Sequence, residues 1–282
     1  MKEGIIVESV FKKYGDINAL NDINIKLEYG TIYGILGRNG AGKSTLINII
    51  SNRIFSDKGR VSLNGISVRE NDLALQDIYV MSEQKYYPPK MKVKDLIYWT
   101  KKFYPSFDLE YSKEISSLFD LNWNKTVESL STGYSSILKI VITLSINVPF
   151  VFLDEPVLGL DINHRDLFYK SLMKRFKDCK NTFVISTHLI EELSDIIEKV
   201  ILIKQGKVLI DESKDTLLER ARKVTGSKEI IANYIKNEDI IATENSGDIY
   251  KAYLLTNTDY SDIKDITIEK LGLQELFLKL TN

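Results

Sequence analysis

The sequence predicts an α/β fold with a mainly parallel central sheet, and three apolar runs carry that prediction. Residues 32–36, 150–153 and 183–185 are each short and mostly or fully apolar, and polar or glycine-rich residues follow each of them. Such runs are typical of strands that are buried on both faces of a parallel sheet. Because ligands of open α/β sheets bind at the carboxyl ends of the strands, we expect functional residues directly after these runs.

Composition narrows the classes of protein that the chain can represent. A length of 282 residues suits one main domain with an appendage, and a formal net charge of -1 favours neither nucleic acid nor an anionic membrane. The single cysteine, Cys179, excludes an internal disulfide. The amino terminus lacks the apolar core of a signal peptide, and the apolar stretch 137–153 is too interrupted to span a bilayer. We therefore expect a soluble cytosolic protein.

The first apolar run leads into the segment GRNGAGKST, residues 37–45, which satisfies the pattern G-x-x-x-x-G-K-[ST]. Glycines allow backbone N–H groups to turn inward around phosphate oxygens, and the start of the expected helix at 44–50 adds partial positive charge. Lys43 is expected to reach the β- and γ-phosphates, and Ser44 to ligate magnesium. The alternative, a glycine-rich turn without a ligand, is disfavoured by this strand–loop–helix context.

The second run ends in two carboxylates, Asp154 and Glu155, in the segment PFVFLDE. Beside a phosphate loop, Asp154 is expected to hold the magnesium shell, while Glu155 orients or deprotonates the attacking water. The alternative is a strand that leads into an acidic surface turn. A GTPase is disfavoured because the chain lacks the N-K-x-D element: Asn124 and Lys125 are followed by Thr126 and Val127.

In this order the motifs resemble those of the nucleotide-binding subunit of an ATP-binding cassette (ABC) transporter, over residues 3–212. The resemblance identifies Glu155 as the catalytic glutamate of the Walker B strand, and Asp161 in LGLD as the aspartate of the D-loop. It identifies His188 in VISTHLIEE as the switch histidine that contacts the γ-phosphate, and Tyr14 in FKKYG as the aromatic residue that stacks on adenine. It also implies that the whole Walker A loop binds ATP, namely Gly37, Arg38, Asn39, Gly40, Ala41, Gly42, Lys43, Ser44 and Thr45.

Two motifs of the family appear with residues that differ from the usual pattern. LSTGY, residues 130–134, stands where the signature L-S-G-G-Q is expected, and the resemblance implies that Ser131, Thr132 and Gly133 contact the ATP of a partner subunit. A serine-capped helix start is the alternative, and Thr132 would cost about 1 kcal/mol in a left-handed backbone. Glu83 and Gln84 are both candidates for the Q-loop residue of the nucleotide site. Either side chain could face magnesium or water, and Gln84 is the one expected as a magnesium ligand.

The cassette is expected to span 1–212 and to include a helical subdomain, with a smaller domain after it. Residues 88–148 are expected to form the helical subdomain, which the resemblance implies docks on a membrane subunit. Its part 88–130 is rich in aromatic and lysine side chains, and acidic residues among them disfavour single-stranded nucleic-acid binding. A plain helical core is the other alternative for these aromatic residues. His164 lies in an expected exposed helix start and receives no role. Residues 213–282 are expected to form a small α+β domain, with a helix at 216–223, a strand at 249–256 and a final apolar face at 271–280.

The sequence thus predicts an α/β P-loop NTPase cassette with a mainly parallel central sheet, an antiparallel β portion, a helical subdomain and a C-terminal α+β appendage. The resemblance implies that a head-to-tail homodimer or heterodimer hydrolyses ATP with Mg²⁺. It implies separately encoded membrane-spanning subunits, a place on the cytoplasmic face of the membrane, no nucleic-acid partner, and export of a peptide, lipid or antimicrobial compound in preference to import.

The alternative function is that of a soluble cassette ATPase acting on nucleic acid or ribosomes. Lys43 and Asp154 are 154 − 43 = 111 residues apart, which leaves no room for the coiled coil of repair ATPases, and a single cassette disfavours a translation factor. A regulator without turnover would lack Glu155 or His188, and both residues are present.

Overall fold

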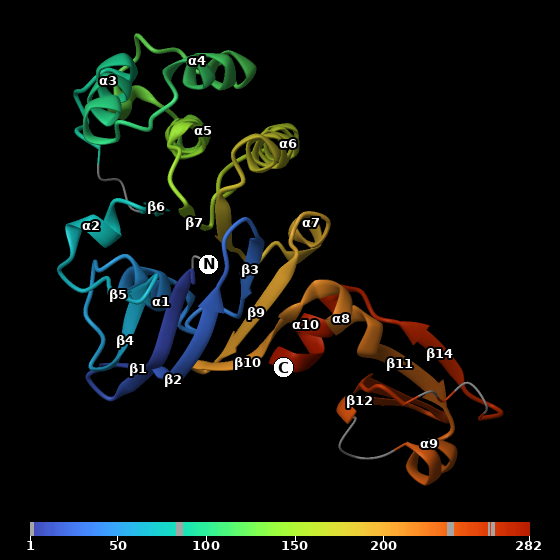
Figure 1. Ribbon diagram of the computed structural model, residues 1–282. Helices are drawn as coiled ribbons and strands as arrows, with labels where there is room; N and C mark the ends of the chain where they lie inside the picture. Colours follow the sequence, from blue (N-terminus) through green and yellow to red (C-terminus); the bar gives the residue numbers. More distant parts are fainter. Residues whose placement is uncertain (1–2, 83–86, 236–239, 259, 261–262) are drawn as a thin grey trace.

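A six-stranded sheet forms the centre of the molecule. The computed structural model describes residues 3–82, 87–235, 240–258, 260 and 263–282 (Figure 1). The strands run in the order β10-β9-β3-β8-β7-β6. Neighbours from β9 to β6 are parallel, and β10 is antiparallel to β9. The mainly parallel sheet predicted from the sequence is confirmed. Its strands are β3 (Ile32–Leu36), β6 (Ile78–Met81), β7 (Phe150–Asp154), β8 (Thr182–Ser186), β9 (Lys199–Lys204) and β10 (Lys207–Ser213).

Both faces of this sheet are buried, as the apolar runs predict. Successive side chains of a strand point to opposite faces. Accordingly, Val151 and Leu153 of β7 join the apolar cluster on the side of α5 and α6, whereas Phe150 and Phe152 join the cluster on the side of α1. All four side chains are fully buried. Burial on two faces explains why this strand has no polar residue before Asp154.

A second, antiparallel sheet in the order β2-β1-β4-β5 covers the face that carries α1 (Lys43–Ile50). Ile5, Val7 and Leu20 from its strands pack in the same cluster as Leu46 of α1. The predicted antiparallel β portion is therefore confirmed. Its strands are β1 (Ile5–Tyr14), β2 (Ile17–Leu27), β4 (Lys58–Leu63) and β5 (Ile66–Ser67).

Helices between β6 and β7 project away from the sheet, at the top of Figure 1. The salt bridge of 3.2 Å between Arg175 Nη1 and Asp108 Oδ2 ties this helical part to the sheet-covering helix α6 (Ile162–Cys179). Arg175 is only 5% exposed, so this pair is shielded from water on the arginine side. The helices are α3 (Val93–Phe103), α4 (Leu109–Leu118) and α5 (Thr132–Ser145), with a 3-10 turn at Val127–Ser129; the short α2 (Asp72–Leu75) precedes β6.

The C-terminal residues form a third sheet, in the order β12-β13-β11-β14, and helices that flank it. One expectation for this part is wrong: the helix α8 ends at Arg220, and residues 221–223 belong to β11, where they pair with β13 on one side and β14 on the other. Pairing on both sides stabilises the strand against the local helical preference of LERARK. The elements are α8 (Lys214–Arg220), β11 (Ala221–Gly226), α9 (Lys228–Tyr234), β12 (Ile240–Ser246), β13 (Ile249–Leu255), β14 (Thr267–Lys270) and α10 (Leu273–Thr281).

The last helix, α10, returns to the central sheet (Figure 1). Leu273 and Leu276 of α10 share one apolar cluster with Leu193 of α7 (Ile190–Ser194). Lys204 at the end of β9 donates a hydrogen bond of 2.9 Å to the carbonyl oxygen of Leu280. The C-terminal part is thus anchored to the strand that neighbours β3. Within the described residues, none of the helices has the length and apolar character needed to cross a membrane.

Candidate functional site

The candidate site lies where three neighbouring parallel strands end. The order β3-β8-β7 places three segments side by side at one edge of the sheet: the phosphate loop after β3, the S-T-H segment after β8 and the two carboxylates after β7. The phosphate loop is more than a hundred residues from the other two segments in the chain, and the parallel topology brings all three together. The carboxyl edge of an α/β sheet is where such folds bind their ligands.

The backbone of the phosphate loop requires its glycines. Gly42 has φ of 110°, in the left-handed region, and a β-carbon there would lie 2.5 Å from the carbonyl oxygen of Ala19. A β-carbon at Gly37 would lie 2.6 Å from the carbonyl oxygen of Ile203. Neither position can hold a side chain without moving the neighbouring strand. Arg38, Asn39, Gly40 and Ser44 are exposed at the mouth of the loop, Gly42 and Thr45 are half-buried, and Gly37, Ala41 and Lys43 are buried.

Lys43 is held inside the loop, only 7% exposed. Its Nζ donates hydrogen bonds to the carbonyl oxygens of Gly37, at 2.6 Å, and of Arg38, at 3.3 Å. Burial lowers the pKa of Lys43, and the carboxylates of Glu155 and Asp154 oppose that shift. A cation at the centre of a phosphate-shaped loop, with two carboxylates facing it, can bind the phosphates of a nucleotide together with a divalent metal ion.

Asp154 and Glu155 are fixed by the neighbouring strand β8. Asp154 Oδ1 accepts a hydrogen bond of 2.6 Å from the Ser186 hydroxyl, and the backbone N–H of Glu155 donates one of 2.8 Å to the carbonyl oxygen of Ser186. Glu155 has φ of 48°, a left-handed conformation that costs a non-glycine residue roughly 1–2 kcal/mol. Strain of this kind is concentrated at functional sites.

The carboxylate of Glu155 faces the residues that follow β8. Its Oε2 accepts a hydrogen bond of 3.1 Å from the Thr187 hydroxyl and lies 3.0 Å from Nδ1 of His188. The Glu155 side chain is 18% exposed and that of His188 is 55% exposed, so the imidazole borders solvent while the carboxylate is sheltered. This geometry suits a carboxylate that takes a proton from water, with a histidine beside it. Motif analysis did not single out Ser186 and Thr187, although both stand in the S-T-H segment.

The oxygen ligands at this site are suited to a magnesium ion that binds together with a nucleotide. No group of three or more histidine, cysteine, aspartate or glutamate side chains within the described ranges could hold a metal alone. Mg²⁺ is normally held by one or two protein oxygens together with phosphate oxygens and water. Asp154, at the end of β7, and Ser44, exposed in the first turn of α1, would be those protein ligands.

The signature segment lies apart from this cluster, at the start of α5. Ser131 caps the helix, accepting a hydrogen bond of 3.3 Å from the backbone N–H of Tyr134. Thr132 is the first helical residue and is not in a left-handed conformation, so the cost considered for that case does not arise. A β-carbon at Gly133 would lie 3.1 Å from the carbonyl oxygen of Gly159 in the D-loop. The backbone that lies close to Gly133 therefore belongs to this same chain.

Asp161 of the D-loop caps α6 and contacts His164. The pKa of Asp161 is lowered, chiefly by the backbone N–H of His164, which donates a hydrogen bond of 2.9 Å to its Oδ1. Nδ1 of His164 lies 2.8 Å from Oδ2 of the same carboxylate. The helix start is exposed at residues 161–163, as expected, whereas the His164 side chain is 26% exposed and lies between Phe119 and Tyr134.

Tyr14 ends β1 and is 48% exposed, as a residue that stacks on a ligand would be. Its hairpin partner strand, β2, reaches the phosphate loop through Ala19, which lies against Gly42. The Lys12 ammonium lies 5.5 Å from the centre of the Tyr14 ring. The two Q-loop candidates, Glu83 and Gln84, lie outside the described residues.

These groups define a phosphate-loop nucleotide hydrolase, and comparison with known proteins identifies its family. The profile of the family described as ABC transporter matches residues 20–158. The uncharacterized ABC transporter ATP-binding protein MJ1023 of Methanocaldococcus jannaschii is 30% identical over 217 residues, which is 74% of this chain and 77% of that protein. The linearmycin resistance ATP-binding protein LnrL of Bacillus subtilis is 24% identical over 274 residues, covering 95% of this chain and 83% of that protein.

Solved structures agree with the fold. The dimeric, post-hydrolysis ATP-binding cassette MJ0796, bound to ADP and Pi, matches with a TM-score of 0.66 at 24% identity, over 74% of this chain and 98% of that chain. The chain belongs to the ATP-binding proteins of ABC transporters. It is an ATPase, and its cofactors are ATP and Mg²⁺.

Proposed function

We propose that the chain powers an exporter of a peptide, lipid or antimicrobial compound. The observation that carries this proposal is the similarity to the linearmycin resistance protein, which extends over 95% of this chain and therefore includes its C-terminal sheet and helices. A resistance protein acts against a toxic compound, and pumping that compound outward is the simplest way for an ATPase subunit to do so. The C-terminal part, residues 213–282, would then be a feature of this exporter type.

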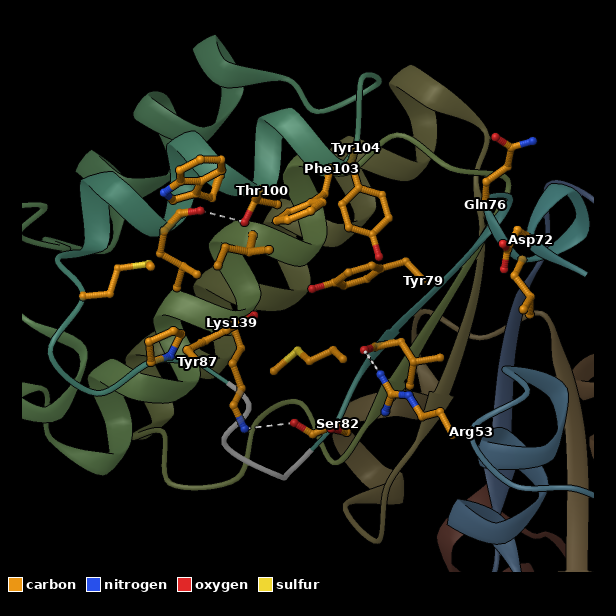
Figure 2. Close-up of a pocket in the computed structure, with 18 residues that line it drawn as sticks. Arg53, Asp72, Gln76, Tyr79, Ser82, Tyr87, Thr100, Phe103, Tyr104 and Lys139 are labelled. Carbon is orange, nitrogen blue, oxygen red and sulfur yellow. Dashed lines mark hydrogen bonds between the residues drawn. The ribbon is translucent and has the colours of Figure 1, made fainter. Parts of the chain in front are cut away.

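In this proposal the ATPase docks on separately encoded membrane subunits through a groove beside the helical subdomain. The groove has a volume of about 1140 Å³ and lies between β6, α2 and the helices α3 and α5 (Figure 2). Aromatic side chains of α3 stand at its edge: Trp99 is 49% and Phe103 76% exposed. Exposed aromatic residues beside a concave apolar surface are typical of binding sites for a protein helix.

The interior of this groove is held rigid by polar contacts. Arg53 donates a hydrogen bond of 3.1 Å to the carbonyl oxygen of Val80, and Lys139 donates one of 2.9 Å to that of Ser82 (Figure 2). The rings of Tyr79 and Tyr104 meet edge to face, 5.4 Å apart, and burial raises the pKa of Tyr79. A preformed groove lowers the cost of binding a partner helix. Because β6 is the strand next to β7, such a helix would bind near the catalytic edge of the sheet.

The proposed active form is a head-to-tail dimer, either of two copies or with a second ATP-binding subunit. Support comes from apolar side chains exposed at the D-loop: Leu158 is 44% and Ile162 81% exposed. In the dimer, Ser131, Thr132, Gly133 and Asp161 would meet nucleotide held by the partner, while Glu155 and His188 would act on the chain's own nucleotide. The dimer would sit on the cytoplasmic face of the membrane through its membrane subunits.

The test combines copurification with transport. A Trp99→Ala, Phe103→Ala double variant should lose most of the membrane protein that copurifies with wild type, while the basal ATPase rate of the isolated chain stays unchanged. Leu118→Ala, another exposed apolar residue of the helical subdomain, is the matched control and should keep its partner. Cells that express the complex should tolerate higher doses in a panel of antimicrobial peptides and lipid-like antibiotics. A complex that concentrates such compounds inside cells would contradict export.

A further inference from the structure

The signature and the D-loop contact each other directly within one chain. The hydroxyl of Ser136, in the first turns of α5, donates a hydrogen bond of 2.8 Å to the carbonyl oxygen of Leu158. Gly159, with φ of 80°, lies close to the methyl group of Thr132: a β-carbon at Gly159 would be 3.1 Å from it. The amino-terminal turns of α5 therefore rest on the D-loop, residues 158–161.

His164 extends this contact by touching both elements at once. Its Nδ1 lies 2.8 Å from Oδ2 of Asp161, the last residue of the D-loop. On the other side its ring meets the ring of Tyr134, the last residue of the signature, edge to face at 6.4 Å. The ring also stacks on the fully buried Phe119, at 6.1 Å and an interplanar angle of 14°, so the imidazole is held in one orientation.

We propose that His164 is a positioning residue that joins Tyr134 of the signature to Asp161 of the D-loop. The two elements then meet the partner subunit as one surface. This inference rests on the proposed head-to-tail dimer, in which both elements face nucleotide bound by the partner. Aromatic pairs contribute about 0.5–1.5 kcal/mol beyond the area that they bury. The glutamine that the signature L-S-G-G-Q would place at position 134 has no aromatic ring. The ring contact therefore depends on both Tyr134 and His164.

Three variants separate the two contacts of the imidazole. His164→Phe keeps a ring against Tyr134 and loses the bond to Asp161, whereas His164→Asn keeps a donor near the position of Nδ1 and loses most of the ring. His164→Ala loses both. Amide hydrogen exchange of the isolated chain should rise mainly at 158–161 in His164→Phe and mainly at 131–136 in His164→Asn. It should rise at both segments in His164→Ala, and β7 should not change in any variant.

Turnover supplies the functional measurement. His164→Ala and Tyr134→Ala should each lower the ATPase rate about fivefold, and the double variant should be no slower than either, because side chains in contact are energetically coupled. The affinity of the monomer for ATP should stay within about twofold of wild type, since neither residue touches the phosphate loop. Leu118→Ala combined with His164→Ala is the control pair, and its effects should add.

The outcomes distinguish this inference from the proposal on which it rests. A wild-type chain that stays monomeric in ATP, and whose copurified membrane complex also holds a single ATP-binding subunit, would overturn the proposed dimer. If wild type dimerises but exchange at 131–136 is the same in wild type and His164→Ala, the histidine does not hold the signature. Simple addition of the Tyr134→Ala and His164→Ala effects would also overturn the inference.

Discussion

Replacing Glu155 by glutamine removes the group that the geometry marks as the base. The amide has nearly the same shape, so it can still accept a hydrogen bond from Thr187, which lies 3.1 Å from the carboxylate oxygen. It cannot take a proton from water. Losing a general base slows a reaction by about 100- to 10,000-fold, which corresponds to roughly 2.7–5.4 kcal/mol in the activation free energy. ATP binding should persist, because Lys43 and its loop are untouched.

The assay measures the ATPase rate and the dimer fraction in ATP by size-exclusion chromatography. Glu155→Gln should hydrolyse at under about one per cent of the wild-type rate and accumulate as an ATP-bound dimer. Glu191→Gln, an exposed carboxylate three residues after His188, is the matched control and should behave as wild type. If Glu155→Gln turns over within threefold of wild type, about 0.7 kcal/mol, another group is the base.

Substitutions at three other positions and one chelation experiment test the remaining parts of the site. Lys43→Ala should weaken ATP binding by about 30-fold or more, because it removes a buried cation that pairs with phosphate; unchanged affinity in equilibrium titration would contradict the phosphate-loop role. Thr187→Val should lower the turnover number roughly tenfold with little change in KM, and Thr187→Ser should restore it. Gly133→Asp should leave monomer ATP binding intact but prevent dimerisation, since its β-carbon meets the Gly159 carbonyl at 3.1 Å and its charge opposes phosphate; normal turnover would mean that LSTGY is only a helix start. EDTA should abolish hydrolysis, with recovery on adding Mg²⁺ but not on adding Ca²⁺ to the same concentration.

The parts of the site that the sequence predicts well are those that one short segment specifies. The phosphate loop follows β3 because a buried strand, a run of glycines and a helix start are all encoded within residues 32–50. The same holds for Glu155, which directly follows the strand β7, and for His188, which stands two residues after the end of β8. Each of these motifs follows a strand that the neighbouring residues predict. Parallel pairing of the three strands then brings the motifs together.

Contacts between distant segments were not predictable in the same way. The polar segment DINHRD predicts the exposed helix start that residues 161–163 form, but it does not predict that Phe119, 45 residues earlier in the chain, covers one side of the His164 ring. From the sequence, Thr132 could have had a left-handed backbone conformation at an energetic cost. In the structure it is the first residue of a helix capped by Ser131, and this cost does not arise. In the C-terminal part, residues 221–223 form a strand because β13 and β14 flank them. The residues around 221–223 do not by themselves predict this pairing.

Two consecutive residues of α6, His164 and Arg165, anchor the D-loop. His164 faces the signature, whereas Arg165 faces the opposite way: its Nε donates a hydrogen bond of 3.0 Å to the carbonyl oxygen of Leu160, and its Nη1 lies 3.0 Å from Oε1 of Glu192 in α7. Glu192 is four residues beyond His188. These contacts link α7 through Arg165 to the D-loop, and the D-loop through His164 and Ser136 to the start of α5. The residues beside the chain's own nucleotide are thereby connected to the surface proposed to meet the partner's nucleotide.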